Sequence, residues 1–163
     1  MTGPRPPRIP NRTRSVATLS AQLRAFGDQF VAEMNDTARD VCYVAAENVI
    51  IGGPFGNPTG TPVDTGYARA QWTPTMENPA YEVGEVDPSG GAVLARVTGV
   101  LMQYQLGIDF WLTNGAVYIR PLEHGHSREQ APLGMVSPML ANAQQIVDHV
   151  VRLRRGGRSG NTG

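Results

Sequence analysis

The stretch from Thr18 to Ile51, TLSAQLRAFGDQFVAEMNDTARDVCYVAAENVII, decides the fold of this chain. Apolar side chains recur in it at steps of three and four residues, which is the period of one face of an α-helix. The stripe consists of Leu19, Leu23, Phe26, Phe30, Met34, Ala38, Val41, Ala45 and Val49. The pattern predicts a helix over residues 18–51, about 50 Å long at about 1.5 Å per residue. Thr18 or Ser20 is the expected N-cap.

The middle of the chain changes to glycine-rich and then to alternating patterns. Residues 52–61 hold four glycines and two prolines and predict a loop. A short helical turn is expected to follow, with Asp64 as its N-cap and Trp72 near its end. Residues 81–86 and 92–97 predict two paired strands around a turn at 87–91, and further strands are expected at 109–113 and 117–119.

The last regular element expected is a helix from Pro138 to Arg154. Its apolar face consists of Met139, Ala143, Ile146, Val147, Val150 and Leu153. The order of a long N-terminal helix, an antiparallel β-rich middle and a C-terminal helix predicts the α+β class. We expect a single domain over residues 16–154, an extended Pro/Arg arm over 1–15 and a flexible Gly/Arg tail over 155–163.

Charge is unevenly distributed in this chain, although its formal net charge is zero. All 14 basic residues are arginines, and eight of them lie in two terminal segments, residues 1–15 and 152–163, that hold no acidic residue. These eight are Arg5, Arg8, Arg12 and Arg14 at one end, and Arg152, Arg154, Arg155 and Arg158 at the other. The remaining six arginines face 14 acids, so the middle carries a net charge of −8. Because arginine pairs well with carboxylate and phosphate, we expect the arms to contact partners.

The residues that could carry catalysis or bind a metal are too few and too poorly placed. His124 and His126 flank a glycine, and a zinc site needs three or four ligands in a closed geometry. Ser127 next to His126 is only a sequence neighbour, and the chain has no nucleophile elbow or phosphate-binding glycine loop. The single cysteine, Cys42, excludes an internal disulfide. We therefore expect no enzyme, no cofactor and no metal.

Neither a membrane span nor a secretion signal is predicted. No apolar run approaches the roughly 20 residues of a membrane helix. The N-terminus is basic but lacks the apolar stretch of a signal peptide. We therefore expect the protein to be made and assembled in a cytoplasm.

Two segments, taken in order, resemble the tail-completion or neck proteins of tailed double-stranded DNA bacteriophages. The first is Pro62-Val63-Asp64-Thr65-Gly66-Tyr67-Ala68-Arg69-Ala70-Gln71-Trp72. The second runs from Tyr118 through Leu122-Glu123-His124-Gly125-His126-Ser127 to Gln130-Ala131-Pro132-Leu133-Gly134-Met135-Val136. Gln71 stands where the family usually has serine, and Glu129 where lysine is frequent. The resemblance covers about residues 18–150.

The resemblance implies a structural protein at the head–tail junction of a virion, assembled in the host cytoplasm. It implies a ring of identical subunits, six-fold by analogy, between the head-completion or connector protein and the tail terminator or tail tube, with genomic DNA passing through. The alternatives are a tail terminator that caps the tail tube, and, from another class, a nucleic-acid-binding protein that uses its arginine arms.

The motif residues are predicted to act as scaffold rather than as reactive groups. Asp64 is expected to cap a helix, Gly66 to permit close packing and Trp72 to anchor the segment. We expect Arg69 to pair with Glu123 and so to lock the first segment to the second. Tyr118 and Gly125 complete the predicted motif set, and the subunit or partner contacts are assigned to Leu23, Phe26 and Phe30 together with the arginines of both arms.

Overall fold

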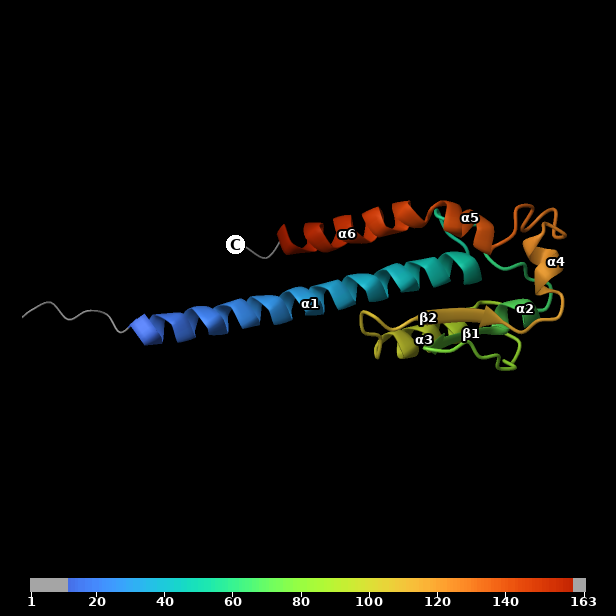
Figure 1. Ribbon diagram of the computed structural model, residues 1–163. Helices are drawn as coiled ribbons and strands as arrows, with labels where there is room; N and C mark the ends of the chain where they lie inside the picture. The colour runs from blue at the N-terminus through green and yellow to red at the C-terminus, as the bar shows by residue number, and fades with distance from the viewer. Residues whose placement is uncertain (1–11, 160–163) are drawn as a thin grey trace, which may run out of the picture. The chain divides into compact units, whose positions relative to one another are not determined.

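The computed structural model describes residues 12–159, without the side chains of residues 12–15, 158 and 159 (Figure 1). Its helices are α1 (Arg12–Ile50), α2 (Tyr67–Ala70), α3 (Gly91–Leu101), α4 (Ile119–Glu123), α5 (Val136–Ala141) and α6 (Ala143–Ser159). Its strands are β1 (Trp72–Met76) and β2 (Phe110–Asn114). The predicted α+β class, with a long N-terminal helix and a C-terminal helix, is confirmed.

The chain divides into two compact units, residues 1–34 and 35–163. In the described part of the first unit, residues 12–34 are all helical and belong to α1. The apolar stripe there is exposed: more than half of Leu23, Phe26 and Phe30 is accessible to solvent.

The second unit builds its core from four different regions of the sequence. The buried cluster contains Ala46, Val49 and Ile50 of α1, Trp72 of β1, Val93, Val97 and Leu101 of α3, and Ala131 and Met135. The two strands pair antiparallel, with Trp72 opposite Asn114 and Met76 opposite Phe110. α3 packs against β1, so the small sheet and two helices share one apolar interior.

α6 returns along the part of α1 that belongs to the second unit (Figure 1). Of the predicted apolar face, Ile146 and Val150 are buried, whereas Val147 and Leu153 are exposed. At the far end of the contact, Arg154 Nη2 lies 2.7 Å from an Asp40 carboxylate oxygen, and Arg154 Nη1 lies 3.7 Å from one of Asp36. These groups are partly exposed, so the pairs orient α6 more than they stabilise it.

The hairpin predicted over residues 81–97 is wrong. Residues 91–101 form α3 instead, and residues 77–90 belong to neither a helix nor a strand. Val93, Val97 and Leu101 are spaced four residues apart and all are buried. A short apolar run fits both periods, and here the helical period allowed one face to enter the core.

Three other predicted boundaries are corrected. The long helix is already formed at Arg12, so Thr18 and Ser20 lie within it and neither is its N-cap. The segment 117–119 is not a strand, because α4 starts at Ile119. The C-terminal helix breaks at Asn142 into α5 and α6. By contrast, the strand predicted at 109–113 is confirmed as β2.

Candidate functional site

Arg69, from the first motif segment, donates three hydrogen bonds to backbone carbonyls. Its Nη1 donates to the Pro88 carbonyl at 2.6 Å. Its Nη2 donates to the carbonyls of Thr59 and Thr61, both at 2.9 Å. Burial lowers the pKa of Arg69, and the nearby carboxylate of Asp87 opposes that effect; the group stays charged, as arginine does in proteins. One guanidinium thus holds the glycine-rich loop, α2 and the 87–91 turn together.

The predicted pair of Arg69 with Glu123 is wrong, because each group has backbone partners instead. The Glu123 carboxylate accepts from the N–H groups of Met135 and Val136 at 2.8 and 2.9 Å. It also accepts from the N–H and hydroxyl of Ser137 at 2.8 and 2.6 Å. These groups form the start of α5, where a negative charge is favourable. Glu123 therefore caps α5.

The ionisation of Glu123 is shifted by this cap. Burial alone raises its pKa, but the hydrogen bonds from Ser137, Val136 and Met135 favour the charged form more strongly. The net result is a pKa below the ordinary value. The carboxylate is therefore matched to its place in the fold and is unsuited to act as a proton donor near neutral pH.

Asp87 was not singled out from the sequence, and it caps α3. Its carboxylate accepts from the N–H groups of Gly90, Ala92 and Val93 at 2.9, 2.9 and 3.3 Å, at the start of α3. Burial raises its pKa, but hydrogen bonds from Ser89 and these three amides bring the pKa below its ordinary value. An Asp shortly before an apolar run with helical spacing was the signal that could have identified it.

Asp64 itself is exposed and does not cap α2. The residue before α2 is Gly66, in the left-handed region with φ 89°, and α2 has no side-chain capping bond there. A Cβ at Gly66 would collide with the backbone of Pro88. The predicted role of Gly66 in close packing is therefore confirmed. Gly125 has φ 79°, and a Cβ there would collide with the carbonyl oxygen of Pro132.

The two motif segments do meet, but through Gln130 rather than through Arg69. The Gln130 amide accepts from the Val63 N–H at 2.7 Å and donates to the Val63 carbonyl at 3.2 Å. The Gln130 carbonyl accepts from Asn57 Nδ2 at 2.7 Å. This pairing joins the second segment to both the first segment and the loop before it.

Trp72 anchors the first segment, as predicted. It is 4% exposed, and its indole N–H donates to the Thr61 hydroxyl at 2.8 Å. The Thr61 hydroxyl donates in turn to the Val49 carbonyl of α1 at 2.9 Å. The residues from Thr61 to Trp72 are therefore fixed on the end of α1 by buried hydrogen bonds.

A shallow pocket of about 200 Å³ lies where the two segments meet. Its walls include residues 62–68 on one side and Tyr118, Leu122, Ser127 and Gln130 on the other. The rings of Tyr67 and Tyr118 stand 6.2 Å apart at an angle of 37°. The side chains offer hydroxyl, amide and aromatic surfaces.

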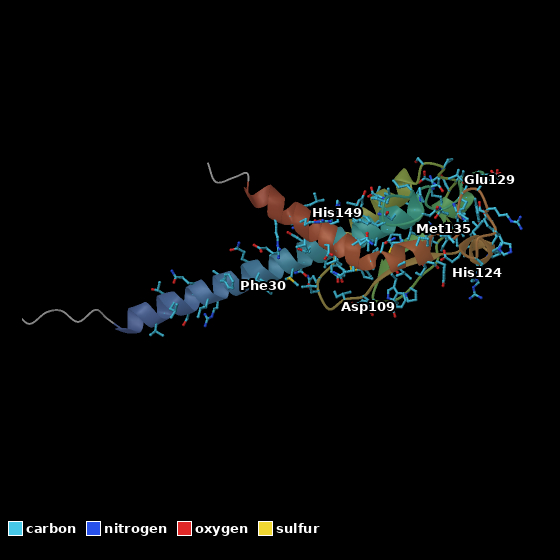
Figure 2. All side chains as sticks on the ribbon, turned by 90° about the horizontal axis from the view of Figure 1, so that it is seen from above. Phe30, Asp109, His124, Glu129, Met135 and His149 are labelled. Carbon is cyan, nitrogen blue, oxygen red and sulfur yellow. The ribbon has the colours of Figure 1, made fainter. Side chains whose placement is uncertain are left out.

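The histidines join no cluster of metal ligands among the described residues. His124 and His126 are exposed, and His126 Nδ1 lies 2.8 Å from the Pro121 carbonyl. His124 and Glu129 both lie at the end of the second unit that carries α4 (Figure 2). Across residues 12–159, no three His, Cys, Asp or Glu side chains gather closely enough to hold a metal ion. Nor does any helix in that range have the length and apolar composition of a membrane span.

The arginines assigned to partner contacts fall into three situations. Arg5 and Arg8 lie outside the described residues, and of Arg12 and Arg14 only the backbone is described, within α1. Arg154 is engaged within the chain by Asp36 and Asp40, and Arg152 Nε donates to the Asp148 carbonyl at 3.2 Å. Arg155 is exposed and open to a partner.

Comparisons of this chain with protein-family models, with curated proteins and with solved structures found no match. The side chains at the motif segments hold backbone groups in place, and the apolar stripe on residues 16–34 of α1 is exposed.

Proposed function

We propose that this chain is a ring-forming structural subunit of the neck of a tailed bacteriophage, a tail-completion protein that joins the head connector to the tail. The observation that carries the proposal is the apolar stripe on residues 16–34 of α1. An exposed apolar surface of this extent is typical of an interaction site. A subunit that functions only in an assembly needs such a surface, whereas a free monomeric enzyme does not.

The chemistry of the motif segments supports a scaffold role. Arg69, Glu123 and Asp87 use their charges on backbone amides and carbonyls of the same chain. A catalytic group must instead present its reactive atoms to a substrate. These residues fix loops in one conformation, which is the requirement for a surface that several partners recognise.

The distribution of charge supports passage of DNA. The middle of the chain carries a net charge of −8. Phosphates are bound strongly where lysine or arginine neutralises them, so an acidic channel wall lets DNA slide without holding it. The arginine arms would then contact the next subunit or an adjacent ring, where opposite charge steers the encounter.

Electron microscopy tests this proposal most directly. The purified full chain is expected to form rings, and antibody labelling of intact virions is expected to mark the head–tail junction. Loss of the gene should leave filled heads and free tails. Labelling only outside the particle, or a normal yield of joined particles without the gene, would end the proposal.

The arms separate the proposal from the nucleic-acid-binding alternative. Deleting residues 1–15 should leave a folded, soluble chain and impair head–tail joining if the arms contact protein partners. If the arms bind nucleic acid instead, the full chain should shift DNA in a gel at low salt and lose that shift with the arms. Normal joining together with no DNA binding would contradict both roles of the arms.

A further inference from the structure

The exposed stripe of the first unit has a spacing more specific than that of a general amphipathic helix. Val16, Leu19, Leu23, Phe26 and Phe30 follow one another at steps of three, four, three and four residues. This is the seven-residue repeat of a coiled-coil seam, with Val16, Leu23 and Phe30 at position a and Leu19 and Phe26 at position d. The five side chains are between 56% and 69% exposed. We call these five residues the seam.

The positions that flank the seam carry no charge. Positions e and g are occupied by Ser20, Gln22, Gly27 and Gln29. The charged residues Arg24 and Asp28 fall at positions b and f, away from the seam. Charges at e and g normally decide which partner a coiled coil accepts. Without them, a copy of the same helix meets no like-charge repulsion, and a partner of opposite charge finds nothing to recognise.

Gly27 gives a second, independent indication that another helix approaches. Glycine in the interior of a helix is less favourable than alanine. A Cβ built on Gly27 meets nothing within 4 Å, so no contact among the described residues requires a glycine there. At a flanking position, the missing side chain lets the backbone of a neighbouring helix come close.

We propose that residues 16–30 form a parallel helical seam between copies of this chain. The occupant of the stripe is the same segment of a second copy, because one apolar heptad complements another and the uncharged flanks fit on both sides. The parallel direction rests on the proposed ring, since rotation about a ring axis leaves neighbouring helices pointing the same way. The seam is about 22 Å long, so a single pair is marginal and association depends on closure of the whole assembly.

Cysteine cross-linking of the full chain tests the direction of the seam. In a Cys42→Ala background, Leu19→Cys and Phe30→Cys are prepared as separate variants and oxidised under mild conditions. A parallel seam predicts disulfide-linked dimers from each variant alone, because equivalent positions face each other. Ala25→Cys, at an outward position c of the same helix, is the matched control and should remain uncross-linked. Cross-linking only when the 19 and 30 variants are mixed would overturn the parallel seam.

Sedimentation of charge variants tests whether a second copy of the chain covers the seam. Leu23→Glu should weaken self-association by at least about tenfold, since it puts an unpaired charge into the seam. Ala21→Glu adds the same charge at the outward position f and should change association less than about twofold. Equal effects of the two variants, or a wild-type chain that stays monomeric at every concentration, would overturn the inference.

The outcome also separates this inference from the proposed function. Rings at the virion neck that form equally well with Leu23→Glu would contradict the seam and leave the neck function intact. Seam cross-links in a protein that labels no part of the virion neck would support the seam and contradict the neck function.

Discussion

The two ends of α1 have the same kind of sequence and opposite surroundings. Phe26 and Phe30, in the first unit, are 69% and 56% exposed, whereas Val49 and Ile50, in the second unit, are 2% and 0% exposed. Both ends present apolar side chains at helical spacing. The difference teaches that periodicity identifies which face of a helix will be covered, but not whether the covering group belongs to the same chain.

Apolar side chains at the two ends of α1 therefore contribute differently to stability. Apolar side chains in the second unit stabilise the folded chain by leaving water. Those of the first unit can contribute only when something else covers them.

Truncating a buried side chain of α1 should lower the free energy of unfolding much more than truncating an exposed one. Ile50→Ala is expected to lower the free energy of unfolding by about 2–5 kcal/mol, because it removes fully buried atoms and leaves a cavity. Phe26→Ala should change it by less than about 0.5 kcal/mol. Urea unfolding, followed by tryptophan fluorescence at a concentration where the chain is monomeric, measures both values. Similar losses for both variants would show that residues 16–34 are covered within the chain.

Removing the Arg69 side chain should lower the free energy of unfolding nearly as much as truncating a core side chain. Arg69→Ala leaves the carbonyls of Thr59, Thr61 and Pro88 without their donor, and a decrease of about 3 kcal/mol in unfolding free energy is expected. Arg69→Lys should recover less than half of this, because an ammonium cannot reproduce the planar fork. Arg128→Ala, on an exposed loop, is the control and should have little effect. A neutral Arg69→Ala would show that the loop keeps its conformation without the guanidinium.

The cap on α5 should make part of the stability dependent on pH. Glu123→Gln is expected to lower the unfolding free energy by about 1 kcal/mol at pH 7. Because the pKa of Glu123 is lower in the folded state, its contribution is full above the unfolded-state pKa and disappears as pH falls through the folded-state pKa. The difference in unfolding free energy between the wild type and Glu123→Gln should therefore decrease as the pH falls. Glu129→Gln, at an exposed site, should show no such gap, and a gap for Glu123→Gln that is constant with pH would contradict the capping role.

The ion pairs between α6 and α1 should have the smallest effect. Arg154 and Asp40 are partly exposed, so a double-mutant cycle of Arg154→Ala and Asp40→Ala should give a coupling of about 0.5 kcal/mol that shrinks with added salt. Ile146→Ala, one of the buried contacts of α6, should cost several times more. A coupling above about 2 kcal/mol would mean that charge, rather than burial, holds α6.

The sequence by itself determined the elements that are long or strongly periodic. The main part of α1, the apolar face of α6 at Ile146 and Val150, strand β2 and the glycine-rich loop all follow from spacing and composition. The meeting of the two motif segments was expected as well, but through an Arg69–Glu123 pair, whereas Gln130 and Val63 join them in the structure. Periodicity of this kind survives tertiary packing because an apolar stripe at helical spacing lies on one face only when the segment is helical.

Only the tertiary structure decided the middle of the chain and the partners of its charged residues. The run around Val93 and Val97 fits a strand or a helix by pattern, and burial of the helical face against β1 selected the helix. Arg69, Glu123 and Asp87 found backbone groups rather than one another. A buried charge requires several well-placed hydrogen bonds, and the amides and carbonyls that supply them come from residues distant in sequence. Their positions exist only once the chain has folded.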